Sequence, residues 1–307
     1  MGRVAKELHW KGVFAAAVSS PRKGTQEMDL SSPLELLDFL AERGVAGVAL
    51  LGSTGEFLHY SLEDRIRLIF LAAKRSRVPL IAGVTHSTYS GTVELAGEAI
   101  RSGADALLVM PPYFFRYSQE DISRFYVELA NEVGQQVPLL LYNIPQFSNP
   151  LHPATVRDLL DTGLFAGIKD SSGDWDFFQG LLELRRTRPF ALVCGNDRIA
   201  LRALREGADA VISGCACAIP EIVAGLEGAV SSGAIAKAEV LDMRLREFIE
   251  KIECFPVPVG VKRAVQLRGQ KVAGTAVPLS ATGVALLQEF DQWFQGWLPQ
   301  ALENINA

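Results

Sequence analysis

Residues 206–213 read Glu-Gly-Ala-Asp-Ala-Val-Ile-Ser, a junction at which an expected helix ends in glycine and the chain enters a short apolar strand. Glycine just past a helix adopts the left-handed cap conformation at little cost. The same Gly-Ala-Asp-Ala sequence occurs at 103–106, and residues 43–45, Arg-Gly-Val, form a similar junction. These junctions indicate a recurring unit of helix, glycine cap and strand.

The expected strands are short apolar runs rich in Val, Ile, Leu and Ala. Their apolar residues are continuous and do not alternate with polar ones, which is typical of parallel strands covered on both faces. The runs are Val13–Val18, Val45–Leu51, Leu80–Val84, Ala106–Met110, Leu139–Tyr142, Phe165–Lys169, Leu192–Cys194 and Ala210–Ser213.

Amphipathic segments between these runs predict helices. In Ser61–Ser76 apolar residues recur at helical spacing and Ser61 offers an N-cap, and Gln119–Val133 has a similar apolar stripe. The strand ends are spaced by roughly 20–35 residues, about the length of one βα unit. Eight such units close into a barrel more readily than they form an open sheet. We therefore expect an α/β fold, a TIM (β/α)8 barrel.

The barrel is expected over residues 10–230, and residues 231–307 are expected to form a helical extension packed on it. Helical periodicity around Val240–Ile252 and Gly283–Trp297 supports this extension. The sequence contains no linker or low-complexity tract that would mark another domain boundary.

The composition is that of an ordinary globular protein. Of its 307 residues, 49% are hydrophobic and 21% charged, and the net charge is −5 with the acidic residues scattered. Such a charge distribution predicts neither nucleic-acid binding nor attachment to a membrane surface. No apolar stretch approaches the roughly 18 residues of a membrane span.

Cysteine and histidine patterns indicate neither a disulfide framework nor a metal site. The four cysteines form no Cys-x-x-Cys pair and lie in apolar surroundings, so we expect buried, reduced thiols in a cytoplasmic protein. The four histidines share no ligand spacing, so no metal is expected. These residues are Cys194, Cys215, Cys217, Cys254, His9, His59, His86 and His152.

Lys169 is the first candidate for chemistry, because it closes the apolar run that begins at Phe165 and is followed by Asp170-Ser171-Ser172. Active sites of TIM barrels lie at the carboxyl ends of the strands. One interpretation is a solvated lysine at the barrel rim. The other is a desolvated lysine, because burial disfavours a charged ammonium and an uncharged amine can attack a ketone.

Two further strand ends carry polar groups. Tyr142 ends an apolar run, either as an aromatic cap on the core or as a general acid/base. Residues 52–56, Gly-Ser-Thr-Gly-Glu, form either a tight βα loop or a small nest whose N–H and hydroxyl groups bind a carboxylate. The spacing is not that of a phosphate-binding P-loop.

Taken together and in this order, these motifs resemble the dihydrodipicolinate synthase/N-acetylneuraminate lyase family. The matching sequences are Gly-Ser-Thr-Gly-Glu at 52–56, Pro-Pro-Tyr at 111–113, Tyr-Asn-Ile-Pro at 142–145, Gly-Ile-Lys-Asp at 167–170 and Gly-Ala-Asp-Ala-Val-Ile-Ser at 207–213. The resemblance extends over roughly residues 10–225.

The resemblance implies a class I aldolase mechanism that needs no metal or organic cofactor. Lys169 would form a Schiff base with pyruvate or another 2-oxo acid, and Tyr142 would relay protons. The loop from Gly52 through Ser53 and Thr54 would hold the pyruvate carboxylate, and Ile212 would line the pyruvate end. The family also suggests a homotetramer built as a dimer of dimers.

Departures from the family pattern concern the second substrate. Dihydrodipicolinate synthases typically carry an arginine where this chain has Phe147, and a second tyrosine, contributed by a neighbouring subunit, where it has Phe114. Phenylalanine can neither pair a carboxylate nor pass a proton. The first hydroxyl of the loop is Ser53 instead of the usual threonine.

N-acetylneuraminate lyases usually have an Asp-Glu pair after strand seven, where this chain has Asp197 and Arg198. Asp197 would still accept from a substrate hydroxyl. Arg198 would suit a carboxylate or phosphate, or would simply lie on a surface helix. These lyases also use a serine near the end of strand eight, where Gly214 falls.

We therefore expect an aldolase or dehydratase acting on pyruvate with an aldehyde, or on a 4-hydroxy-2-oxo acid of the 2-oxo-3-deoxy sugar acid type. The side chains of Phe114, Phe115, Phe147 and Trp175 are expected to make its distal pocket apolar. The alternatives are a 4-hydroxy-tetrahydrodipicolinate synthase, an N-acetylneuraminate lyase, or a barrel that binds a 2-oxo acid and has lost catalysis.

Overall fold

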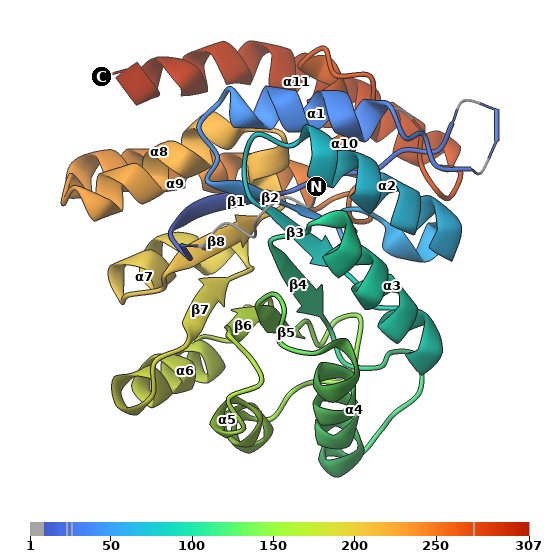
Figure 1. The fold of residues 1–307 in the computed structure, drawn as a ribbon. Helices are drawn as coiled ribbons and strands as arrows, with labels where there is room; N and C mark the ends of the chain where they lie inside the picture. The colour runs from blue at the N-terminus through green and yellow to red at the C-terminus, as the bar shows by residue number, and fades with distance from the viewer. Residues whose placement is uncertain (1–8, 23, 26, 273, 307) are drawn as a thin grey trace.

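Eight parallel strands close into a barrel in the order β1 to β8, with β1 paired to β8 (Figure 1). The computed structural model describes residues 9–22, 24–25, 27–272 and 274–306. This is the expected TIM barrel. The strands are β1 Gly12–Ala16, β2 Gly47–Leu50, β3 Leu80–Gly83, β4 Ala106–Val109, β5 Leu139–Asn143, β6 Gly167–Asp170, β7 Ala191–Cys194 and β8 Ala210–Ser213.

All eight expected strands are present, but two begin later than their apolar runs. Val45 and Phe165 are buried, yet β2 begins at Gly47 and β6 at Gly167. A Cβ at Gly167 would lie 2.0 Å from the backbone oxygen of Ala191, so only glycine lets β6 approach β7 here. The apolar character of Val45 and Phe165 therefore predicted their burial correctly. The strands begin two residues later, at glycines where neighbouring backbones approach closely.

The repeated Gly-Ala-Asp-Ala sequence forms the same junction twice. Gly103 and Gly207 have φ of 92° and 104°, which confirms the left-handed caps. A carboxylate oxygen of Asp105 accepts from the N–H of Leu80 at 2.8 Å, which ties the start of β4 to β3. Asp209 accepts in the same way from Leu192 of β7 at 2.8 Å. The aspartate therefore aligns each strand with the strand before it.

Helices surround the barrel (Figure 1). The two expected helices are confirmed: Ser61 caps α2 by accepting from the N–H of Asp64 at 3.1 Å, and α4 spans Gln119–Val133. The helices of the barrel are α1 Ser32–Ala41, α2 Leu62–Arg75, α3 Tyr89–Ser102, α4 Gln119–Val133, α5 Pro153–Asp161, α6 Trp175–Thr187, α7 Ala200–Arg205 and α8 Pro220–Ser231. Short 3₁₀ turns are η1 Phe57–His59, η2 Asp197–Ile199 and η3 Cys215–Cys217.

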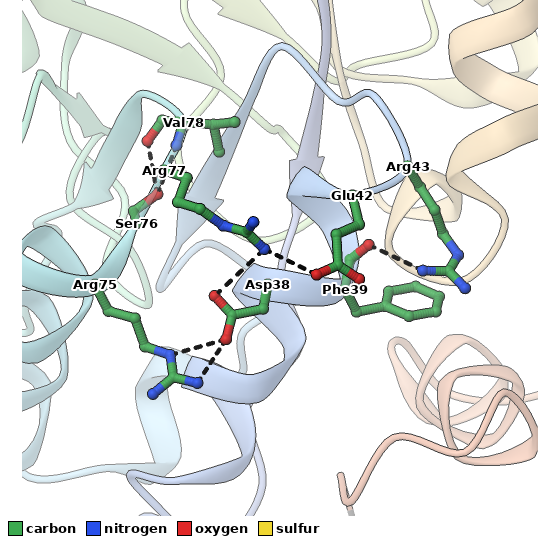
Figure 2. Close-up of polar contacts among 8 residues, drawn as sticks. All are labelled: Asp38, Phe39, Glu42, Arg43, Arg75, Ser76, Arg77 and Val78. Atoms are coloured by element: carbon green, nitrogen blue, oxygen red, sulfur yellow. Dashed lines mark hydrogen bonds and ion pairs between the residues drawn. The ribbon is translucent and has the colours of Figure 1, made fainter.

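Ion pairs at the surface join α1 to the end of α2 (Figure 2). Asp38 accepts from Nε of Arg75 at 3.1 Å and lies 3.9 Å from Arg77, whose guanidinium also donates to Glu42 at 3.0 Å. The hydroxyl of Ser76 donates to the carbonyl of Val78 at 2.6 Å and shapes the turn into β3. Exposed pairs of this kind contribute at most about 1 kcal/mol each, so their main effect is to align the two helices.

Three helices follow the barrel: α9 Ile235–Ile252, α10 Val259–Leu267 and α11 Ala281–Asn306. Helices α9 and α11 pack through buried aromatic rings, with Phe248 stacked on Trp297 at 5.9 Å between centroids, and α10 contacts both helices. In Figure 1, α11 lies along the same side of the barrel as α1 and α8. This packing fixes the segment between α9 and α10, which lies at the mouth of the barrel cavity described below.

All four cysteines are free, as expected from their spacing. Cys194, Cys215 and Cys217 are buried. The expectation of burial was wrong for Cys254, which is exposed because it lies in the turn after α9. No helix in the described part of the chain is long and apolar enough to span a membrane.

Candidate functional site

Lys169 and Tyr142 lie side by side, because β5 and β6 pair with these two residues in register. The amine of Lys169 is 4.2 Å from the centroid of the Tyr142 ring. The two residues are only 5% and 3% exposed, respectively, so the solvated rim lysine considered above does not fit this geometry. The phenol and the amine therefore lie together, buried from bulk solvent, at the carboxyl end of the barrel.

Gly195, directly after β7, makes room for the lysine side chain. A Cβ on Gly195 would lie 2.6 Å from Cε of Lys169 and 2.1 Å from Oγ of Ser171. The backbone here is fixed on both sides, because Gly195 N donates to the carbonyl of Asp170 at 2.7 Å and Ser171 Oγ donates to Gly195 O at 3.0 Å. Sequence reasoning missed Gly195, since nothing local reveals which side chain packs on it.

On the opposite face of the same strands, a buried polar network locks β5 to β6. The Asn143 amide donates to Asp170 Oδ1 at 2.7 Å, and the Ser172 hydroxyl donates to Asp170 Oδ2 at 2.9 Å. Successive side chains of a strand point to opposite faces, so this network lies behind Tyr142 and Lys169. Burial raises the pKa of Asp170, and the hydrogen bonds from Asn143 and Ser172 counteract that rise.

The glycine loop brings a hydroxyl to the phenol. Ser53 Oγ lies 3.3 Å from Tyr142 Oη, within hydrogen-bonding distance. The turn is closed by two backbone hydrogen bonds, from Gly55 N to Gly52 O at 3.1 Å and from Glu56 N to Ser53 O at 3.0 Å. Thr54 is buried beside Ser53 and lines the same cavity. The loop thus presents two hydroxyls next to the phenol and amine.

A buried ion pair anchors this loop to the C-terminal helices. Glu56 adopts a left-handed conformation with φ of 51°, and its carboxylate pairs with Lys262 of α10. The Lys262 and Glu56 side chains are 2% and 8% exposed. Burial lowers the pKa of Lys262, and the adjacent Glu56 carboxylate opposes this shift. The loop position therefore depends on a helix more than 200 residues away in the sequence.

The amine, the phenol and the hydroxyls of the glycine loop all line one cavity of about 410 Å³. Of the residues singled out from the sequence, the structure brings Ser53, Thr54, Tyr142, Phe147, Lys169, Asp197, Arg198, Ile212 and Gly214 to its wall. The opposite wall comes from α9, α10 and the segment between them, which sequence reasoning did not connect with the site. It consists of Ile249, Ile252, Glu253, Val257, Pro258 and Val261.

The other predicted site residues lie outside this cavity wall. Gly52 contributes to the turn but does not line the cavity. Phe114 is 88% exposed and, with Phe115, lines a separate cavity of about 700 Å³. Trp175 lies elsewhere, with the Arg202 guanidinium 3.7 Å from its ring centroid. Four aromatic residues were expected to line the distal pocket. Of these, Phe147 lines the cavity within one chain.

Asp197 is already engaged by groups of the protein. The Ser213 hydroxyl donates to one of its carboxylate oxygens, and the N–H of Cys215 donates to the other at 3.2 Å. Burial raises the pKa of Asp197, while these hydrogen bonds and the nearby Lys169 charge lower it. Asp197 thus joins β7 to the end of β8, and this leaves it fewer acceptor sites for a ligand.

Arg198 points to the mouth of the cavity and pairs with Glu253 at the end of α9. Its Nε donates to Glu253 at 2.7 Å, and its Nη2 binds the second carboxylate oxygen. Among the described residues, no three His, Cys, Asp or Glu side chains gather closely enough to share a metal ion. The polar groups at the site include the Lys169 amine, the Tyr142 phenol, the Asp197 carboxylate and the Arg198–Glu253 ion pair.

Comparisons with known proteins agree with this arrangement. A sequence model of the dihydrodipicolinate synthetase family matches residues 9–290. A 4-hydroxy-tetrahydrodipicolinate synthase from Kosmotoga olearia is 32% identical over 271 residues, which are 87% of this chain and 91% of that protein.

Solved structures give the same result. A prophage protein of the dihydrodipicolinic acid synthase family from E. coli K12, in complex with pyruvate, matches with a TM-score of 0.86 at 26% identity, over 94% of this chain and 98% of that one. A sialic acid aldolase from Ruminococcus gnavus matches with a TM-score of 0.85, over 95% of this chain and 99% of that one. Its identity is only 21%, so this likeness concerns the fold alone.

Proposed function

Because the chain belongs to the dihydrodipicolinate synthetase family of pyruvate-dependent class I aldolases and lyases, we propose that it cleaves or forms a 4-hydroxy-2-oxo acid through an imine on Lys169. The observation that carries this proposal is the buried amine, 4.2 Å from the Tyr142 ring, with Ser53 bonded to the same phenol. This geometry places the amine beside a group that can transfer protons, as imine formation requires.

The reaction begins when the Lys169 amine attacks the ketone carbon of the 2-oxo acid. Loss of water from the carbinolamine gives a protonated imine. Tyr142 gives its phenolic proton to the hydroxyl that leaves the carbinolamine as water, and it becomes a phenolate. In the cleavage direction this phenolate accepts the proton of the 4-hydroxyl, the C3–C4 bond breaks, and its electrons move into the imine to leave an enamine, whose C3 then takes that proton from Tyr142. The aldehyde departs, and water releases pyruvate and the free amine. The imine is the electron sink, so the proposal requires no metal or organic cofactor.

Ser53 and Thr54 bind the substrate carboxylate in this proposal. Hydroxyls and backbone N–H groups of the Gly52–Gly55 turn provide the donors that a carboxylate needs. Ile212 lines the same cavity, and in this proposal it packs against the pyruvate carbon chain. The bond between Ser53 and Tyr142 gives the phenol a hydroxyl neighbour to which its proton can pass.

The second substrate is proposed to be of the 2-oxo-3-deoxy sugar acid type. Phe147 faces the cavity where a cation would be needed for the distal carboxylate of aspartate semialdehyde. The competing candidate is 4-hydroxy-tetrahydrodipicolinate synthesis, which is the activity named for the curated relatives.

A product assay separates these two candidates. The protein is incubated with a panel of 2-oxo-3-deoxy sugar acids, and released pyruvate is measured. In parallel it is given pyruvate and aspartate semialdehyde, and the condensation product is sought. Pyruvate release from the panel supports our proposal, whereas efficient condensation with aspartate semialdehyde would replace it with the synthase.

We also propose a homotetramer in the cytoplasm. Exposed aromatic side chains support the assembly, since Phe114 and Phe115 are 88% and 65% exposed in the single chain. Four free cysteines support the location. Light scattering coupled to size-exclusion chromatography tests the assembly, and a monomer would contradict it.

A further inference from the structure

The mouth of the reactive cavity carries an ion pair that joins two distant parts of the chain. Arg198 belongs to η2, directly after β7, and Glu253 is the C-cap residue of α9. Both line the same cavity as Lys169. Their side chains are 41% and 51% exposed, so the pair lies at the rim, where a substrate tail would leave the cavity.

Both carboxylate oxygens of Glu253 are used by the guanidinium. Nε of Arg198 donates to one oxygen at 2.7 Å and Nη2 binds the other, which is the two-point geometry that arginine forms with carboxylates. A substrate carboxylate would need this same edge of the guanidinium. It would have to displace Glu253 or lie beside its negative charge.

The remaining charges of the cavity offer no replacement. The cations among the described lining residues are Lys169 and Arg198, and the anions are Asp197 and Glu253. Lys169 is committed to the imine. No other lining side chain in the described part of the chain carries a charge, and the apolar ones include Ile249, Ile252 and Val257. A charged tail would therefore lose hydration without gaining a free cation.

We infer that Glu253 is a specificity-determining residue, which occupies Arg198 and so selects substrates whose distal end carries no negative charge. This inference rests on the proposed imine chemistry at Lys169. A neutral tail meets the apolar wall, and polar hydroxyls can still bond to the outer edge of the ion pair. The cavity therefore discriminates against acidic aldehydes although it contains the Arg198 cation, because Glu253 already neutralises that cation.

The test uses imine formation and needs no turnover. The full-length protein is titrated with 2-oxoadipate or with 2-oxohexanoate, which has the same carbon chain but ends in a methyl group. Borohydride traps the imine, and intact mass gives the concentration for half-maximal modification. The ratio of the two concentrations measures discrimination against the distal carboxylate, and pyruvate is the reference ligand for every variant.

In the wild type we expect 2-oxoadipate to require the higher concentration. Glu253→Gln should lower the ratio by about fivefold, the scale of a half-exposed ion pair. Arg198→Gln, which leaves the Glu253 charge uncompensated, should raise it by about as much. The matched control is Glu239→Gln, which removes an exposed charge from the same helix, where it pairs with Arg205, and it should leave the ratio unchanged.

An unchanged ratio in both Glu253→Gln and Arg198→Gln would overturn the inference, and so would a wild type that forms the imine equally well with both long acids or that forms none with 2-oxohexanoate. In each case pyruvate would still be trapped. Absence of pyruvate trapping in the wild type is a different result, because it would overturn the proposed function itself.

Discussion

Replacing Gly195 by alanine tests whether the precise position of the Lys169 amine sustains the chemistry. The new methyl group would lie 2.6 Å from Lys169 Cε and 2.1 Å from Ser171 Oγ, where real contacts require well over 3 Å. The Asp170 carbonyl is 3.1 Å away on another side and is fixed by the barrel hydrogen bonds. The lysine side chain and the serine hydroxyl must therefore move.

Overpacking of this kind costs about 1–3 kcal/mol of stability. A displacement of about 1 Å at a reacting atom costs roughly 100-fold in rate. We expect Gly195→Ala to remain folded with a lower melting temperature and to form the pyruvate imine at least about 100-fold more slowly. The assay follows trapped adduct against time at saturating borohydride, alongside thermal unfolding of the same sample.

Gly228→Ala is the matched control. Gly228 lies on the exposed face of α8. A Cβ built at this position would have no atom of a neighbouring described residue within 4 Å, apart from the backbone of its own helix and its chain neighbours. Alanine in a helix interior stabilises by about 0.5–1 kcal/mol over glycine, and imine formation should be unchanged. If Gly195→Ala trapped pyruvate at the wild-type rate, the packing of Gly195 on the lysine would have no role in reactivity.

Three further variants test other parts of the site. Tyr142→Phe should lower kcat for aldol cleavage by roughly 100- to 10,000-fold, because the proton relay is lost, and should change substrate binding little, as steady-state kinetics will show. Lys262→Met should destabilise the fold by about 3–5 kcal/mol in urea denaturation, since it leaves the buried Glu56 charge unpaired. Burial raises the pKa of Asp170 above its ordinary 3.8. Between the unfolded-state and folded-state pKa values, the folded protein binds a proton that the unfolded chain has lost. The free energy of unfolding therefore decreases as the pH rises through the folded-state pKa. The free energy of unfolding of the wild type relative to Asp170→Asn should therefore fall as the pH is raised from below 3.8, as measured by urea titrations.

Each of these variants has its own control or contradicting result. Wild-type turnover in Tyr142→Phe would remove the phenol from the mechanism. The double variant with Glu56→Gln should recover part of the stability lost in Lys262→Met, and no recovery would deny the ion pair its role. A stability difference for Asp170→Asn that does not vary with pH would show that burial of this carboxyl is already fully compensated.

The sequence predicted those parts of the site that short stretches encode. Continuous apolar runs gave all eight strands, and the polar residue at a run's end identified Lys169 and Tyr142 as neighbours at one rim. Because parallel strands end on the same side of a barrel, local patterns sufficed to gather these groups. The motif of the Gly52–Gly55 turn belongs to the same class of local signal.

Long-range partners could not be predicted in this way. Glu253 and Lys262 reach the site from helices far along the chain, and their sequences are those of ordinary amphipathic helices. Gly195 is distinguished only by the side chains that pack on it. Apolar character extends two of the expected strands back to Val45 and Phe165, although both residues are buried in connecting segments.

Borohydride reduction in the presence of pyruvate, followed by peptide mass spectrometry, tests the central claim directly. The account predicts a pyruvyl adduct on the peptide that contains Lys169, with no such adduct in Lys169→Arg. An unmodified Lys169, or an adduct on another lysine that persists in Lys169→Arg, would contradict it.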